Sequence, residues 1–123
     1  MTNREWQDKF WHMFALLKLK ADELGQPFIV IEWMRSLEQQ KINVARGVSK
    51  TMNSMHLLGL AVDIAFLSDI TDDRKINYTP DQYKMLGEYW ESIGGRWGGR
   101  FGDDPKTTKI EGWDSGHFEL EKK

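Results

Sequence analysis

The chain has 123 residues, a formal net charge of −2 and no cysteine. This length fits a single domain over residues 1–123, which can bury about two-thirds of its unfolded surface without cross-links. The lack of cysteine excludes disulfides, thiolate metal sites and a cysteine nucleophile, and the small net charge gives no reason to expect a nucleic-acid partner.

The predicted elements begin with an amphipathic helix over residues 2–24. Its apolar side chains recur at helical spacing, Thr2 and Glu5 form a capping box, and Gly25 ends it. A β-branched and aromatic run predicts a strand over residues 28–33. A second capping box, made by Ser36 and Gln39, opens a short helix that runs to about Ala45.

The second half of the chain is predicted to alternate loops with strands and one further helix. Residues 47–55 form a loop, 60–66 a largely buried strand and 67–78 a polar loop. A helix opened by Thr79 ends at Gly94 and Gly95, and a short kinked strand (96–101), a loop (102–112) and a last strand (117–120) follow. The pattern predicts an α+β domain with three helices packed on a small, mainly antiparallel sheet.

The sequence also sets expectations about location and assembly. No apolar run is long enough to span a bilayer, so we expect no membrane insertion. The N-terminus lacks the apolar core of a signal peptide, so we expect synthesis in the cytoplasm. Since no apolar stripe is left without a core to face, we expect a monomer.

One carboxylate lies in an apolar setting. Asp63 occupies the middle of the predicted buried strand, where a carboxylate is costly unless it is paired or bound to a metal. It could form a salt bridge with an arginine such as Arg35, or face water at a sheet edge.

Two of the three histidines favour a metal site for Asp63 instead. His56 precedes the strand that carries Asp63, and His117 opens the last strand. Imidazole and carboxylate are suitable zinc ligands, and three protein ligands with an open fourth position are typical of catalytic zinc. The sequence therefore indicates a Zn²⁺ site formed by His56, Asp63 and His117.

Two motifs around these residues carry a family resemblance. Residues 54–63 read Ser-x-His-x-x-Gly-x-Ala-x-Asp, and residues 114–120 read Asp-x-x-His-x-Glu-Leu. Both resemble the zinc peptidases of the D-alanyl-D-alanine carboxypeptidase superfamily, and within it the phage endolysins that cut the L-alanyl-D-glutamate bond of peptidoglycan. Residues 35–39, 47–54 and 100–102 resemble weaker segments of the same family.

The resemblance implies a catalytic role for Asp114. It implies His56, Asp63 and His117 as zinc ligands and Asp114 as the acid/base three residues before the last ligand. Carboxypeptidase and dipeptidase branches carry glutamate at that place, so aspartate favours the endopeptidase branch. Glu111 and Glu119 are rival candidates. Glu119 lies on the same strand face as His117 and is better suited to support that ligand.

Further residues have weaker assignments. Arg35 could bind a substrate carboxylate or stabilise the carbonyl oxygen as it becomes an oxyanion, or it could form a structural ion pair. Ser49, Ser54 and Gln39 could orient the ligands or bind the substrate. Trp97 and Trp113 are better explained as core residues than as the lining of a cleft.

The expected function is that of a zinc-dependent endopeptidase acting on the stem peptide of bacterial peptidoglycan. An endolysin of this kind would be made in the host cytoplasm and would reach the cell wall after the membrane is permeabilised. The alternatives are a D-alanyl-D-alanine carboxypeptidase on the same scaffold and a catalytically silent zinc-binding interaction module.

Overall fold

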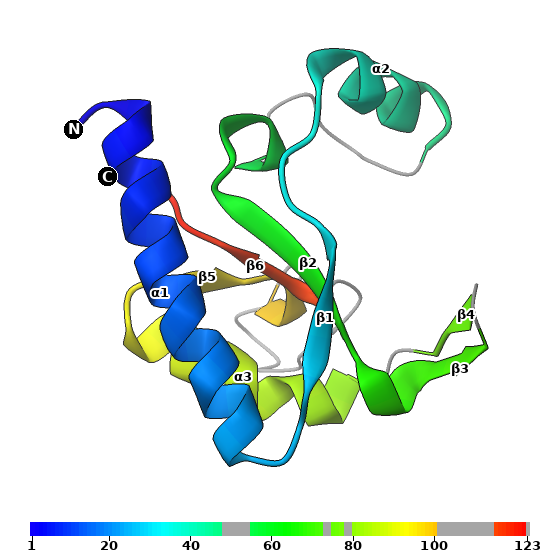
Figure 1. Ribbon diagram of the computed structural model, residues 1–123. Coiled ribbons are helices and arrows are strands. Elements are labelled where there is room, and N and C mark those ends of the chain that lie inside the picture. Colours follow the sequence, from blue (N-terminus) through cyan, green and yellow to red (C-terminus); the bar gives the residue numbers. More distant parts are fainter. Residues whose placement is uncertain (48–54, 73–74, 78–79, 101–114, 123) are drawn as a thin grey trace, which may run out of the picture.

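A computed structural model describes residues 1–47, 55–72, 75–77, 80–100 and 115–122. Its element order confirms the predicted α+β class, since the described residues contain three α-helices and a four-stranded antiparallel sheet (Figure 1). None of the described helices combines the length and the apolarity needed to cross a membrane.

The first helix, α1 (Asn3–Glu23), begins where the sequence predicts. The Thr2 hydroxyl accepts a hydrogen bond from the Glu5 backbone N–H, and the Glu5 carboxylate accepts one from the Thr2 N–H. These two bonds satisfy N–H groups that the first helical turn leaves without partners. The helix stops before Gly25, whose φ of +72° suits glycine.

The sheet has the strand order β1 (Phe28–Glu32), β2 (Ala61–Phe66), β6 (His117–Glu119) and β5 (Arg96–Trp97), and every neighbouring pair is antiparallel. β6 therefore lies between two strands that precede it in sequence. Val30 faces Ile64 and Glu32 faces Asp63, so Ile31 is an extra residue in β1 and forms a bulge.

One face of the sheet packs into the apolar core, and the opposite face carries Asp63. Val62, Ile64 and Phe118 join a buried core with apolar residues of α1 and of α3 (Pro80–Ser92). Trp97 is 1% exposed in this core, and its indole N–H donates to the Ser115 carbonyl, in agreement with its predicted core role. Since side chains alternate along a strand, Asp63 lies on the opposite face.

Three predictions differ from the structure in detail. The predicted polar loop 67–78 instead contains the η2 turn (Leu67–Asp69) and a small antiparallel pair, β3 (Ile70–Asp72) with β4 (Lys75–Ile76). The predicted strand 96–101 is cut to two residues, because the 3₁₀ turn η3 (Gly98–Arg100) follows at once. Trp33 lies beyond the end of β1.

The second helix, α2 (Leu37–Ala45), stands apart from α1 and α3 at the top of Figure 1. The Ser36 hydroxyl caps it by accepting from the Gln39 backbone N–H. The Gln39 amide runs along the helix and donates to Asn43. Gln40 is the one residue of α2 that is buried.

Candidate metal centre

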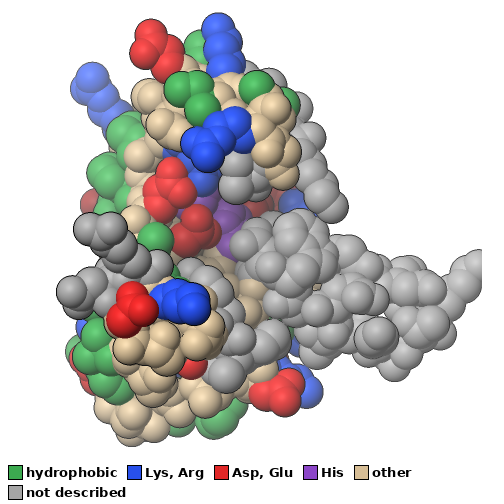
Figure 2. All heavy atoms as spheres, turned by 90° about the vertical axis from the view of Figure 1, so that its right-hand side faces the viewer, with side chains coloured by type: hydrophobic (Ala, Val, Ile, Leu, Met, Phe, Trp, Pro, Cys, Tyr) green, Lys and Arg blue, Asp and Glu red, His purple; other side chains and the backbone are tan. Residues whose placement is uncertain are grey.

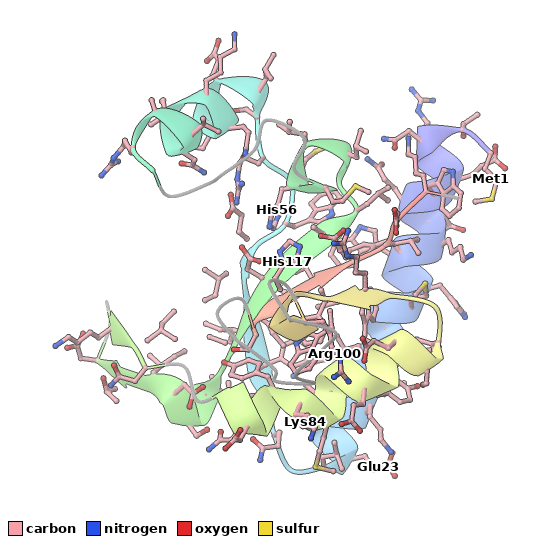
Figure 3. All side chains as sticks on the ribbon, turned by 180° about the vertical axis from the view of Figure 1, so that it is seen from behind. Met1, Glu23, His56, Lys84, Arg100 and His117 are labelled. Atoms are coloured by element: carbon pink, nitrogen blue, oxygen red, sulfur yellow. The ribbon has the colours of Figure 1, made fainter. Side chains whose placement is uncertain are left out.

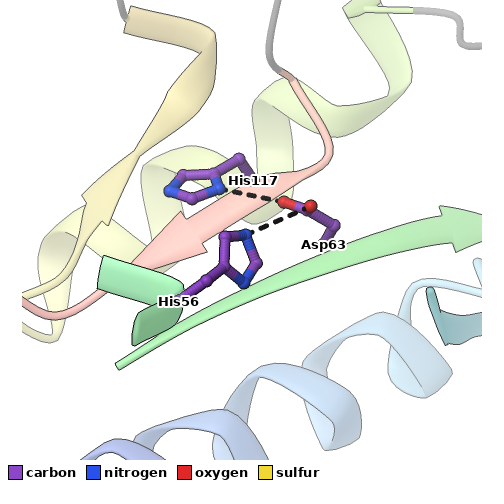
Figure 4. A group of neighbouring side chains, drawn as sticks. All are labelled: His56, Asp63 and His117. Atoms are coloured by element: carbon purple, nitrogen blue, oxygen red, sulfur yellow. Dashed lines mark hydrogen bonds and ion pairs between the residues drawn. The ribbon is translucent and has the colours of Figure 1, made fainter. Parts of the chain in front are cut away.

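Three side chains from three separate segments meet on the open face of the sheet (Figure 4). His56 comes from the 3₁₀ turn η1 (Met55–Leu58), Asp63 from the middle of β2, and His117 from the start of β6. Asp63 and His117 are direct cross-strand partners, which places their side chains on one face. One ligand atom from each residue lies within 4.8 Å of the other two.

The carboxylate of Asp63 faces both rings. Its Oδ1 lies 2.9 Å from Nδ1 of His117, and its Oδ2 lies 3.2 Å from Nε2 of His56. His56 and His117 are buried, while the Asp63 side chain is 27% exposed. In Figure 2 histidine side chains lie in a recess of the surface beside acidic side chains, so solvent can reach this face.

Each ring has a second partner that orients it. Nδ1 of His56 donates to the Trp33 carbonyl at 2.6 Å, and Nε2 of His117 donates to the Glu119 carboxylate at 2.7 Å. A neutral imidazole has one N–H, so these bonds turn the lone pairs of His56 Nε2 and His117 Nδ1 toward Asp63. Metal-binding histidines are oriented in the same way, by a carbonyl or carboxylate on the far nitrogen.

The electrostatics of the cluster fit a cation. Burial by itself would raise the pKa of Asp63, but when the ring nitrogens that face Asp63 carry hydrogens, the hydrogen bonds from His117 and His56 outweigh burial and hold this pKa below its ordinary value. When these nitrogens carry lone pairs instead, the lone pairs and the ionised carboxylate repel one another at these distances unless positive charge lies between them. Two imidazoles and one carboxylate are a donor set that suits Zn²⁺.

Arg35 does not form the salt bridge with Asp63 that the sequence left open. Its Nε and Nη2 donate to the two carboxylate oxygens of Glu32 at 2.7 and 2.6 Å, and its Nη1 donates to the Gln40 amide oxygen. The Arg35 side chain is 9% exposed and the Glu32 side chain 32%, so the two form a partly buried, bidentate ion pair that joins the end of β1 to α2. These hydrogen bonds lower the pKa of Glu32.

The sequence analysis missed three residues next to the centre, namely Glu32, Trp33 and Gln40. Gln40 is fully buried against Arg35, whereas its neighbour Gln39, the residue singled out from the sequence, is exposed. An acid three residues before an arginine predicts an ion pair only within a helix, and Glu32 lies in a strand, so the sequence carried no signal for this pair. Trp33 contacts His56 through its backbone carbonyl, which any residue carries.

Several predicted site residues lie outside the described residues, namely Ser49, Ser54, Glu111, Trp113 and Asp114. Their assignments remain predictions. Within the described residues the structure brings together His56, Asp63, His117 and Glu119. Figure 3 shows His56 and His117 close to each other at the sheet, while Glu23 and Lys84 lie near the other end of the molecule.

Comparison with known proteins supports a common origin for this centre. A family model described as D-alanyl-D-alanine carboxypeptidase matches residues 47–120, which include His56, Asp63 and His117. The L-alanyl-D-glutamate peptidase of Listeria phage A118 is 37% identical over 79 residues, which are 64% of this chain and 28% of the phage protein. The chain thus spans little more than a quarter of that relative.

Two solved structures share the fold. The L-Ala D-Glu endopeptidase ChiX of Serratia marcescens is 27% identical, with a TM-score of 0.56 over 78% of this chain and 68% of ChiX. A mutant of the vancomycin-resistance D,D-pentapeptidase VanY, from a VanB-type cassette and in complex with Zn(II), has a TM-score of 0.58 over 91% of this chain and 70% of VanY. VanY is 22% identical, so its likeness concerns the fold alone.

The contact between Glu119 and His117 predicts an effect on metal affinity. Glu119→Gln keeps the shape of the side chain but removes the negative charge that makes His117 a stronger donor. We expect roughly tenfold weaker Zn²⁺ binding, measured by competition with a chromogenic chelator. Glu121→Gln, which removes the same charge at an exposed position two residues on, is the control and should bind Zn²⁺ like the parent.

The pair of Glu32 and Arg35 predicts a pH-dependent stability. Because the pKa of Glu32 is lower in the folded than in the unfolded chain, the pair stabilises the fold above about pH 4.5 and loses this contribution as the pH falls. Glu32→Gln should lower the free energy of unfolding by about 1 kcal/mol at pH 7, a value reduced for partial exposure. Urea titrations of the metal-free protein should show the gap closing at acidic pH.

A surface ion pair is the control for this measurement. Glu88 lies 3.9 Å from Lys84, and both side chains are more than half exposed. Glu88→Gln should change stability little at any pH. An equal loss in both variants would mean that the pair with Arg35 has no special strength.

Proposed function

The chain belongs to the D-alanyl-D-alanine carboxypeptidase family, and we propose that it is a zinc-dependent peptidoglycan endopeptidase that hydrolyses the L-alanyl-D-glutamate bond of the stem peptide. The observation that carries the proposal is the cluster of His56, Asp63 and His117, whose ligand atoms lie within 4.8 Å of one another. The phage relative and ChiX are both named for action on an L-alanyl-D-glutamate bond, which supports this substrate.

The metal would be held by Nε2 of His56, Nδ1 of His117 and the Asp63 carboxylate. These are the atoms that remain directed at the centre when the other ring nitrogens donate to the Trp33 carbonyl and the Glu119 carboxylate. When bound there, Zn²⁺ lowers the pKa of a coordinated water toward about 7 and polarises a carbonyl group. Three protein ligands leave room for water and substrate, as hydrolysis requires.

Asp114 would serve as the general acid/base. It would accept a proton from the water that attacks the L-alanyl carbonyl carbon, and would give a proton to the D-glutamate nitrogen as the C–N bond breaks. The products would be a new carboxylate on L-alanine and a free amine on D-glutamate. This assignment rests on the place of Asp114 three residues before His117 in the sequence.

Arg35 would bind a substrate carboxylate or stabilise the carbonyl oxygen as it becomes an oxyanion. Its guanidinium is held between β1 and α2 by hydrogen bonds to Glu32 and Gln40. Ser49, Ser54 and Gln39 would contact the stem peptide. Glu119 would hold His117 in its binding orientation.

Cleavage by a carboxypeptidase is the second candidate, because the description of the matching family names that activity. It differs in its product, since a carboxypeptidase releases free D-alanine whereas the proposed endopeptidase leaves the D-alanyl end intact. A zinc-binding module without activity would release neither product.

The phage origin of one relative also supports a setting for the enzyme. The protein would be made in the host cytoplasm and would act on the cell wall once another protein has permeabilised the membrane. It would act as a monomer, since all three proposed metal ligands come from one chain.

Digestion of purified peptidoglycan tests the reaction. We expect the protein to release fragments with a new amine on D-glutamate, identified by mass spectrometry, and to lose this activity in the presence of a chelator. Added Zn²⁺ should restore it. Free D-alanine as the main product would indicate the carboxypeptidase reaction instead. Intact peptidoglycan would indicate a zinc-binding module without activity.

The role of Asp114 has its own test. Asp114→Asn should bind one equivalent of Zn²⁺ and lower kcat by about 10²- to 10⁴-fold, because it removes proton transfer and keeps the ligands. His117→Ala should lose both Zn²⁺ and turnover. Asp8→Asn, the same substitution at an exposed position of α1, is the control. Near-normal turnover in Asp114→Asn would move the acid/base to another residue.

A further inference from the structure

The turn that carries His56 is held by side chains from outside it. The Leu58 carbonyl accepts hydrogen bonds from the Gln7 amide at 2.8 Å and from the Asn3 amide at 3.2 Å, both on α1. The next carbonyl, that of Gly59, accepts from the indole N–H of Trp33 at 2.9 Å. Two successive carbonyl groups of the chain leaving η1 are thus fixed from two directions.

Gly59 shows how closely these groups pack. Its φ of +69° is a conformation that residues with a Cβ rarely adopt. A Cβ at this position would lie 2.7 Å from Nε2 of Gln7 and 3.3 Å from Cζ2 of Trp33. The turn therefore has no room to shift toward either side chain.

Trp33 also contacts His56 directly. Its carbonyl accepts the His56 Nδ1–H at 2.6 Å, and two residues on, the Arg35 N–H donates to the His56 carbonyl at 3.0 Å. The Trp33 ring packs edge-on against Trp11 of α1, with 5.2 Å between the ring centroids. The position of Trp33, and through it of His56, thus depends on α1.

We propose that Gln7 and Trp33 form a turn clamp that holds His56 where it can share a metal with Asp63 and His117. The inference rests on the metal centre of the proposed function. It makes α1 part of that centre, although both clamp residues precede the segment that matches the family model. The two are positioning residues, since their side chains act through the backbone of the turn and not on the metal.

The turn clamp raises the fraction of molecules in which His56 is placed to bind the metal. Zn²⁺ binds all three ligands only when Nε2 of His56 faces Asp63, and the apparent affinity falls with the fraction of molecules in that arrangement. Loss of one hydrogen bond to a carbonyl of the turn lets other arrangements compete. The loss therefore weakens metal binding, even though neither Gln7 nor Trp33 is a ligand.

Two conservative substitutions test the clamp in the full chain. Trp33→Phe removes the indole N–H but keeps an aromatic ring and the backbone carbonyl, and Gln7→Met removes the amide but keeps the length of the side chain. Each should weaken Zn²⁺ binding about threefold, and the double variant about tenfold, in competition with a chelator. The visible spectrum of the Co²⁺-loaded double variant should also change, because it reports the ligand geometry.

Matched controls separate positioning from general stability. Trp6→Phe makes the same change in a ring of α1 that packs against the core, and Gln82→Met makes the same change at an exposed position of α3. Both should keep the parental Zn²⁺ affinity. Clamp variants that melt at lower temperature but bind Zn²⁺ like the parent would overturn the proposal, as would controls that weaken binding equally.

The same titration distinguishes this proposal from the proposed function. A parent protein that binds no Zn²⁺ would refute the metal centre and the clamp together. A parent that binds Zn²⁺ but leaves peptidoglycan intact would refute the hydrolase alone. Unchanged affinity in all clamp variants of an active parent would refute the clamp alone.

Discussion

The register between β2 and β6 is the constraint on which the centre depends. It places Asp63 directly opposite His117, so a carboxylate and an imidazole share one face of the sheet without any help from a loop. A shift of one residue would turn Asp63 into the apolar core and bring Val62 or Ile64 to the open face. Because those two side chains are fully buried against the helices, the core itself protects the register of the centre.

The charges around the centre are arranged in layers. Asp63 is nearest to the metal position, and the partners of the histidines, the Trp33 carbonyl and the Glu119 carboxylate, lie behind the rings. Arg96 lies 3.8 Å from the Glu119 carboxylate, and Arg35 pairs with Glu32 beside Asp63. The two carboxylates that are not placed to bind the metal thus each have an arginine, which limits the excess of negative charge near Asp63.

Local patterns allowed much of the fold to be predicted. The capping box of α1 and the apolar run of β2 are short-range signals, and both elements begin and end within a residue or two of the prediction. The pair β3–β4 was missed because it is short and polar, so it lacks the alternation that marks a strand with one buried face. The bulge in β1 was also missed, although it brings Glu32 opposite Asp63.

The site, like the fold, could be predicted only in part from the sequence. Histidine is rare here, and Asp63 is set apart from the other aspartates by the apolar run around it, so His56, Asp63 and His117 could be chosen from the sequence. Gln40 was passed over because the capping pattern drew attention to Gln39, and only the fold shows which of the two faces Arg35. Backbone carbonyl groups carry no residue-specific signal, so the contact between the Trp33 carbonyl and His56 could not be predicted.

The centre also depends on elements that precede the segment matched by the family model. Residues 47–120 contain all three proposed ligands but neither α1 nor β1. Without α1, the sheet face formed by Val62, Ile64 and Phe118 would lose its contacts with Phe10 and the other apolar residues of that helix. Without β1, the edge of β2 nearest Asp63 would lose its pairing. The ligands are thus encoded in one segment, and the scaffold that brings them together requires the preceding one as well.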